Sequence, residues 1–284
     1  MARHALPREK LKAAARRPPP ATRHTAPPPV RPSPSRKGPA MTPSLSVVIP
    51  VWNDSDALAS CLTRLRDPSA PPAEIIICDA SPAPAEKSRV AELATRHAAR
   101  LLACPQPSRG AQLAAGAVAA TNDVIVFTHA DTTLTATHLH AVTHHLATHP
   151  TLQAGAFHRD VASLYPNLTW ATPFIRWWMA ELGTIYGDQS PFIRRQTLAR
   201  FGGYPPLPIM EDMAFSDQMR QQLARDECRL LDPPLPTSPR RFRRRGTLRN
   251  KLHNLTLIAA WRFGAVSPEK IHQLYYQHRS EGET

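Results

Sequence analysis

The stretch LSVVIPVWNDSDALASCLTRLR, residues 45–66, decides the fold of this 284-residue chain. Its first seven residues, Leu45–Val51, form an almost continuous run of branched apolar side chains, which predicts a strand buried on both faces. The segment 54–66 then carries apolar residues at helical spacing, with Asp54 or Ser55 as the N-cap. A buried strand followed directly by a helix is the first half of a βαβ unit.

The same alternation continues to about residue 150. Further strands are expected at 74–79, 101–104 and 123–127, and further helices at 86–99, 109–120 and 133–149. This spacing predicts an α/β fold with a doubly wound, mostly parallel sheet. After Thr151 the alternation weakens, and helices are expected at 168–182, 213–225 and 252–263.

The N-terminal forty residues differ from the rest in composition. They hold ten of the 31 prolines, ten Lys or Arg residues and one acidic residue, Glu9, and so carry nine of the 13 net positive charges. Such a segment buries too little apolar surface to offset its ordering entropy, so we expect it to be disordered. We favour a solvated extension over a nucleic-acid-binding arm or a transit-type leader, and no nucleic-acid partner is expected.

Cysteine usage and hydropathy bear on the compartment. The four cysteines are scattered without a C-x-x-C pattern, which favours a reducing compartment over a disulfide framework or a zinc site. No apolar stretch reaches about 18 residues, so no membrane span is expected. These features predict a cytoplasmic protein.

Polar residues follow three of the predicted strands, where doubly wound sheets bind ligands. They are Asn53, Asp79 and the segment His129–Asp131. Asp131 suits a divalent cation that holds a diphosphate, or equally the N-cap of the helix expected at 133–149. Asp79 suits either a base or ribose, or hydrogen bonds within its own turn.

Two further groups of side chains have a structural and a chemical interpretation. Glu211 and Asp212 are either acids that favour a helix start or a source of a general base. Five histidines fall in the helix expected at 133–149. We interpret them as a solvated helix face, with a metal site as the alternative, because the H-E-x-x-H pattern is absent. They are His138, His140, His144, His145 and His149.

Seven motifs follow one another along the chain. They are SVVIPVWND (46–54), IIICDAS (75–81), SRGAQLAAGA (108–117), DVIVFTHADTTL (123–134), YGDQSPFIRR (186–195), FGGYPPLPIMED (201–212) and SPRRFRRRGTLR (238–249). Taken in this order, they resemble inverting glycosyltransferases of family 2 with the GT-A fold. They are most similar to a bacterial branch labelled arsenosugar-biosynthesis-type glycosyltransferases.

The resemblance implies a tail at 1–43 and one GT-A domain at 44–278. This domain would have a Rossmann-like donor half at about 44–133 and an acceptor half at about 134–278. The implied enzyme is hexosyltransferase-like. It moves a sugar from a nucleoside-diphosphate sugar to a small or lipid-linked acceptor, with inversion, and uses Mn²⁺ or Mg²⁺.

The resemblance also implies residue roles. Asp212 would be the catalytic base, with Glu211 beside it, and Asp131 with His129 would hold the metal. Tyr186, Asp188 and Gln189 would face the acceptor. Donor-binding roles would fall to Pro50, Val51, Asn53, Asp79, Arg109, Gln112, Arg240 and Arg241.

The sequence departs from the family pattern after Asp79, where relatives continue with glycines and a second Asp. This departure leaves an alternative function open, a catalytically degenerate GT-A domain. Such a domain would bind polyanions or a membrane surface through the tail and the basic segment 240–249. Peripheral contact of 252–263 with the inner face of the membrane is a related alternative to a helix packed on the domain.

Overall fold

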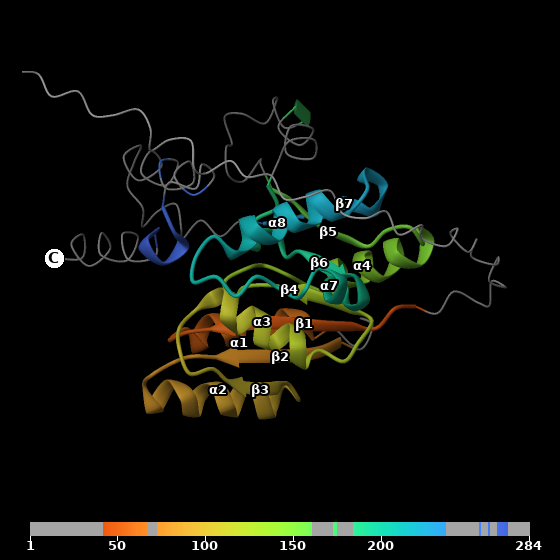
Figure 1. The fold of residues 1–284 in the computed structure, drawn as a ribbon. Coiled ribbons are helices and arrows are strands. Elements are labelled where there is room, and N and C mark those ends of the chain that lie inside the picture. Colours follow the sequence, from red (N-terminus) through yellow and green to blue (C-terminus); the bar gives the residue numbers. More distant parts are fainter. Residues whose placement is uncertain are drawn as a thin grey trace, which may run out of the picture. The chain divides into compact units, whose positions relative to one another are not determined.

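A mixed sheet organises the part of the chain that the computed structural model describes, which is residues 42–66, 73–160, 173–174, 184–236, 256, 261 and 266–271. Within these residues the sheet has seven strands in the order β3-β2-β1-β4-β6-β5-β7 (Figure 1). β6 runs antiparallel to β4 and β5, and all other pairings are parallel. The strands are β1 (Leu45–Val51), β2 (Ala73–Asp79), β3 (Arg100–Ala103), β4 (Val124–Phe127), β5 (Ala154–Arg159), β6 (Phe192–Arg194) and β7 (Cys228–Leu235).

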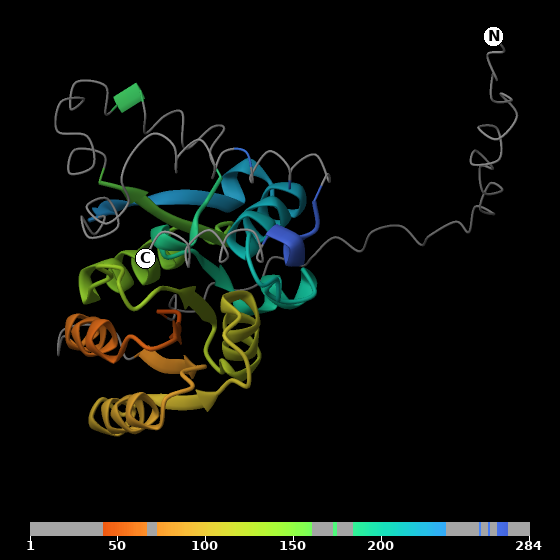
Figure 2. The same cartoon turned by 90° about the vertical axis from the view of Figure 1, so that its left-hand side faces the viewer.

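Helices cover both faces of the sheet. Figure 2 shows α1, α2 and α4 on one face and α3, α7 and α8 on the other. This is a doubly wound α/β arrangement, as the alternation of strands and helices predicts. The described helices are α1 (Ser55–Leu65), α2 (Pro84–Arg96), α3 (Arg109–Ala119), α4 (Ala136–Thr148), α7 (Arg195–Arg200) and α8 (Glu211–Gln222), with 3₁₀ turns η3 (Gly187–Gln189) and η4 (Arg225–Glu227).

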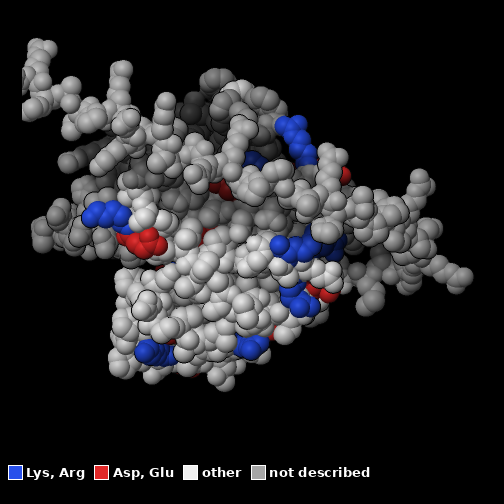
Figure 3. Space-filling model, viewed as in Figure 1, with Lys and Arg blue, Asp and Glu red and all other residues white. Residues whose placement is uncertain are grey.

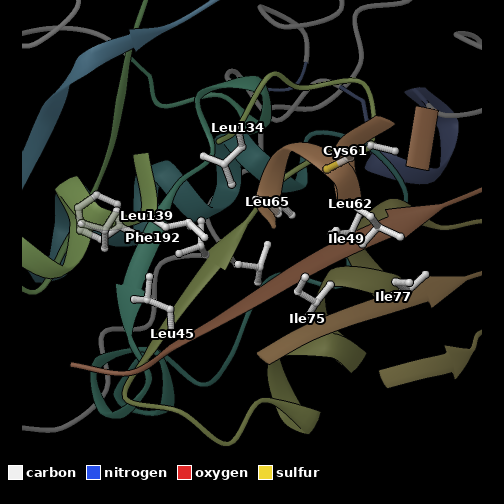
Figure 4. Close-up of a cluster of buried hydrophobic side chains, with 14 of the residues drawn as sticks. Leu45, Ile49, Cys61, Leu62, Leu65, Ile75, Ile77, Leu134, Leu139 and Phe192 are labelled. Carbon is white, nitrogen blue, oxygen red and sulfur yellow. The ribbon is translucent and has the colours of Figure 1, made fainter. Parts of the chain in front are cut away.

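Each face of the sheet has its own hydrophobic core, because successive side chains of a strand point to opposite faces. In β1, Leu45 and Ile49 pack with Leu62 of α1, and Figure 4 shows this cluster. Val48 points the other way and packs with Leu113 of α3. Strand β1 is therefore buried on both faces, which explains its nearly continuous apolar sequence.

The strands and helices predicted between residues 45 and 127 are confirmed. The strand expected at 45–51 is β1, and those expected at 74–79, 101–104 and 123–127 match β2, β3 and β4 to within one residue at each end. The helices α1, α2 and α3 also form where helical spacing was found, although α2 begins and ends two to three residues early.

The helix expected at 133–149 begins later than predicted, and Asp131 does not cap it. α4 starts at Ala136 with Thr135 as its N-cap. The backbone N–H of Thr135 donates to His138 Nδ1 at 3.2 Å, which occupies the cap. A turn precedes it, in which Thr132 N donates to His129 O at 3.0 Å. Asp131 therefore lies in the loop between β4 and α4.

The weak alternation after Thr151 conceals three strands, β5, β6 and β7. β6 has only three residues, and β7 contains Pro233 and Pro234, so neither gives a clear strand pattern. The helix expected at 213–225 is α8, which begins two residues earlier, at Glu211. The helices expected at 168–182 and 252–263 fall outside the described residues, apart from Pro173, Phe174, Thr256 and Trp261.

The close packing of α3 on the sheet is testable at Gly116. A Cβ there would lie 2.3 Å from Val48 Cγ1 and 2.8 Å from Cys78 Sγ. We expect Gly116→Ala to lower the free energy of unfolding by about 1–2 kcal/mol, although Ala is the better helix former. Combined with Val48→Ala it should cost less than the sum of the two changes, because the new methyl fills vacated space. Urea denaturation of the four proteins measures this, and additive losses would contradict it.

Candidate functional site

The candidate site lies at the carboxyl edge of the sheet, where the strand order reverses between β1 and β4. β1, β2 and β4 are neighbours, and the register pairs Val51 with Asp79 and Val48 with Phe127. Residues that follow these strands therefore meet at one edge, as the sequence predicts. Pro50 and Val51 end β1, and Val51 is buried.

Asp79 and Asn53 are joined through Ser81. Ser81 donates from its backbone N and from Oγ to Asp79 Oδ1, at 3.0 and 2.6 Å, and Ser81 Oγ accepts from Asn53 N at 2.8 Å. Asn53 has a φ of 50°, a left-handed conformation that Asn tolerates. Asp79 Oδ2 accepts no hydrogen bond from the described residues, so one oxygen of this carboxylate is available to a ligand.

Gln112, on α3, links the carboxyl ends of β1 and β2 through hydrogen bonds. Its side chain is buried, and Nε2 donates to Val51 O at 2.8 Å and to Cys78 O at 2.7 Å. Both protons of the amide nitrogen are thereby used. These bonds tie α3 to the ends of both strands, and Val51 O also accepts from Ala80 N at 3.0 Å.

Arg109 and Glu211 form an ion pair between α3 and α8. Arg109 Nε meets Glu211 Oε1, with the Glu211 side chain fully buried and the Arg109 side chain 39% exposed. Burial raises the pKa of Glu211, and the Arg109 charge opposes that shift. Burial lowers the pKa of Arg109, but the Glu211 carboxylate outweighs it and the net pKa is raised. Glu211 Oε2 and the buried Tyr204 hydroxyl have no hydrogen-bond partner in the described part of the chain.

The backbone around 205–207 sits directly on the first turn of α3. A Cβ at Gly110 would lie 2.2 Å from Leu207 O and 2.8 Å from Pro205 O, so only glycine fits there. The segment that leads into α8 and the ion pair therefore contact the same end of α3.

Asp212 is joined to the loop after β4 through Gly187. Gly187 N donates to Asp212 Oδ2 at 3.0 Å, and Met213 N donates to Asp212 Oδ1 at 2.8 Å. A Cβ at Gly187 would lie 2.4 Å from His129 Nε2, so the buried His129 ring packs against this glycine. His129 and Asp212, 83 positions apart in the sequence, thus flank one residue.

Asp131 is half-buried in the loop after β4. Burial raises the pKa of the Cys61 thiol, on α1, to about 11, and Arg64 opposes this shift. The negative charge of Asp131 also raises the pKa of Cys61, which indicates that Asp131 lies near α1. Among the described residues, no group of three or more His, Cys, Asp or Glu side chains is arranged to hold a metal. The single carboxylate of Asp131 still fits Mg²⁺ or Mn²⁺, because such ions often use one or two protein carboxylates together with substrate phosphates.

The three residues predicted to face the acceptor belong to η3 and the residue before it. Asp188 Oδ1 pairs with Arg159 Nη2 at 2.5 Å, and the Arg159 guanidinium lies 4.6 Å from the centre of the Tyr186 ring. Gln189 is buried and donates from Nε2 to Phe157 O at 3.0 Å. Gln189 thus holds the turn on β5, while Tyr186 and Asp188 remain partly exposed.

Several residues of this edge were not singled out from the sequence. Trp52 follows β1 and is 49% exposed, which is unusual for so large an apolar side chain. The sequence feature that could have pointed to Trp52 is an aromatic residue placed directly after a predicted strand. Ser81 was signalled by the Asp-x-Ser spacing, which is typical of a side-chain turn. Gly187 acts through its backbone N–H and gave no signal. Arg240 and Arg241 lie outside the described residues.

A separate hollow of about 740 Å³ lies at the opposite edge of the sheet. Its lining includes Pro43 and Asp123, which precede β1 and β4, and Arg194, Arg195 and Arg200. Figure 3 shows Lys or Arg side chains gathered over the region of α7, with acidic side chains beside them. This hollow is not part of the candidate site. No described helix is both long and apolar enough to cross a membrane.

Several solved structures have a similar fold. A mannosyltransferase from Pyrobaculum calidifontis, solved with GDP-Man and Mn²⁺, matches with a TM-score of 0.53 and 18% identity over 73% of this chain and 60% of that one. The glucosyl-3-phosphoglycerate synthase of Mycobacterium tuberculosis, solved with Mn²⁺, UDP and glucosyl-3-phosphoglycerate, has a TM-score of 0.51 and 18% identity over 74% and 75%. Residues 1–349 of S. aureus TarS, solved with UDP-GlcNAc, match with a TM-score of 0.51 and 13% identity over 68% of this chain and 58% of that one.

These likenesses confirm the expected GT-A-like α/β fold. The chain spans less than two thirds of the length of the mannosyltransferase and of the TarS fragment. No curated protein matches. The family model described as "Glycosyl transferase family 2" matches residues 46–198, more than half of the sequence, and the chain therefore belongs to that family.

Proposed function

We propose that this chain is an inverting glycosyltransferase that uses a nucleoside-diphosphate sugar, a divalent cation and an Asp base. Its acceptor is a small or lipid-linked molecule. The observation that carries the proposal is the hydrogen bond from Gly187 to Asp212, with His129 packed on the same glycine. It joins a carboxylate on α8 to the loop that holds Asp131, at the edge where such sheets bind nucleotides.

The donor's nucleoside is proposed to bind at the ends of β1 and β2. Asp79 Oδ2 is available as an acceptor for a base or ribose donor, and the exposed face of Trp52 is suited to stacking. Ser81 supports this assignment, because it orients the Asp79 carboxylate in place of the family's glycine-rich continuation. The two neighbours solved with GDP-Man and with UDP are consistent with such a donor.

The diphosphate is proposed to lie between the loop after β4 and α3. Asp131, with His129 nearby, would hold Mn²⁺ or Mg²⁺, which neutralises charge on the leaving diphosphate. Arg109 uses Nε for Glu211 and keeps its Nη groups, and its partial exposure leaves them for phosphate oxygens. Arg240 and Arg241 are proposed as further phosphate ligands on the resemblance alone.

The reaction is proposed as a direct displacement. Asp212 accepts the proton of an acceptor hydroxyl as its oxygen attacks the anomeric carbon, and the bond to the diphosphate breaks on the opposite side. The N–H groups of Gly187 and Met213 orient the carboxylate but leave lone pairs on both oxygens. Tyr186 and Asp188 are proposed to contact the acceptor, with Gln189 holding their turn.

A thermal-shift and calorimetric panel tests donor and metal together. UDP, GDP, ADP and dTDP, and their sugars, are titrated with and without Mn²⁺. We expect one nucleotide to stabilise the protein only with Mn²⁺, by about 2.7 kcal/mol at a hundredfold excess over Kd. Asp131→Asn should remove the Mn²⁺ dependence, whereas Asp226→Asn, an exposed Asp in η4, should behave as wild type. If no nucleoside diphosphate binds, the degenerate binding module becomes the better hypothesis.

Asp212→Asn tests the base. We expect release of nucleoside diphosphate from the donor identified by that panel to fall about 10²- to 10⁴-fold, because an amide cannot accept the proton. Calorimetric Kd for the donor should change little. The matched control is Asp217→Asn on the same helix, which should retain activity. Wild-type turnover by the Asp212→Asn variant would remove Asp212 from the mechanism.

The Arg109–Glu211 pair makes a separate prediction about stability. Glu211→Leu leaves the Arg109 charge unpaired, so we expect the free energy of unfolding to fall by about 3 kcal/mol. This is the lower end for broken buried pairs, because Arg109 is 39% exposed. Adding Arg109→Met should recover part of the loss, since neither charge then remains. Urea denaturation of the single and double variants measures this recovery. A double variant less stable than Glu211→Leu would contradict the prediction.

A further inference from the structure

The outer face of α4 carries two pairs of histidines at i, i+4 spacing, and the proposed reaction uses none of the four. The rings of His140 and His144 lie 6.4 Å apart between centroids, with 23° between their planes. Those of His145 and His149 lie 5.6 Å apart, with 27° between their planes. Histidines four apart on a helix share a face and can bind one metal ion together.

The two pairs differ in what their ring nitrogens contact. His149 Nε2 lies 3.3 Å from Arg229 Nη1, and His149 Nδ1 lies 3.0 Å from Thr148 Oγ1. Both nitrogens of this ring are therefore occupied. A cation at His149 would also meet the guanidinium charge of Arg229.

His140 and His144 are free of these constraints. Both are exposed, and within the described part of the chain no hydrogen bond engages their ring nitrogens. α4 contains no Lys, Arg, Asp or Glu, so neither a competing cation nor a neutralising acid lies on the helix itself. Both rings are solvent-exposed, so their side chains have room to turn toward a shared ion, which a zinc–imidazole site holds about 2.0–2.1 Å from one nitrogen of each ring.

We infer that His140 and His144 form a two-imidazole site for a borderline divalent transition cation such as Zn²⁺. No third protein ligand is arranged beside them in the described residues, so water or an external ligand completes the coordination. Imidazole pairs favour Zn²⁺, Ni²⁺ or Cu²⁺ over Mn²⁺ and Mg²⁺, which prefer oxygen. The site is therefore chemically distinct from the cation site proposed at Asp131, and the two proposals stand or fall separately.

Zinc titration of the full chain, produced without a polyhistidine tag, tests this inference. Calorimetry at pH 7.5 should show a zinc-binding event that His140→Ala and His144→Ala each weaken at least about tenfold, since two linked ligands bind far better than one. His149→Ala, with the ring next to Arg229, and Asp131→Asn should leave the event unchanged. Lowering the pH should weaken the event, because protons compete with the metal for imidazole nitrogens.

The outcomes are unambiguous because both histidines are exposed and their replacement leaves the core intact. Far-UV circular dichroism and the melting temperature without metal check that each variant is folded. Zinc binding that survives in both His140→Ala and His144→Ala, or that is lost in His149→Ala, would place the metal elsewhere. No zinc binding by the wild-type protein would overturn the inference outright.

Discussion

The buried contact between Arg109 and Glu211 is the constraint on which the candidate site depends. Glu211 is fully buried at the start of α8, and a carboxylate there is tolerated only because a guanidinium meets it. The same end of α3 also receives the backbone of 205–207 against Gly110. The start of α8 is thus tied to the donor side of the sheet, which determines where the next residue, Asp212, lies.

From that tie the rest of the edge follows through short backbone contacts. Asp212 reaches the N–H of Gly187, and Gly187 supports the ring of His129. Toward β2, Gln112 of α3 holds the ends of β1 and β2 together, and Ser81 orients Asp79. Few charged side chains meet directly, so the site is assembled by backbone donors and acceptors that the sheet and the helices hold in place.

Two cation chemistries are separated within one segment of the chain. Asp131 is not used to cap α4, because Thr135 and His138 occupy that cap. Its carboxylate therefore remains in the loop, where the proposed oxygen-preferring ion would share it with the diphosphate. His140 and His144 lie on a helix without acidic residues, so the cation proposed there is one that prefers nitrogen ligands. The two proposed sites therefore differ in the type of ligand that they offer.

The sequence by itself determined the first four strands and three of the helices, because each has a strong local pattern of apolar residues. It also indicated Asn53, Asp79 and His129–Asp131, since residues that follow parallel strands meet at one edge. Short β6 and proline-containing β7 were not predicted, as pairing with distant strands stabilises them. Only the tertiary structure decided that Arg109 pairs with Glu211 and that Gly187 links Asp212 to His129. These contacts join residues 25 to 102 positions apart, and the one at Gly187 depends on a glycine that has no side chain. No local sequence pattern encodes such contacts.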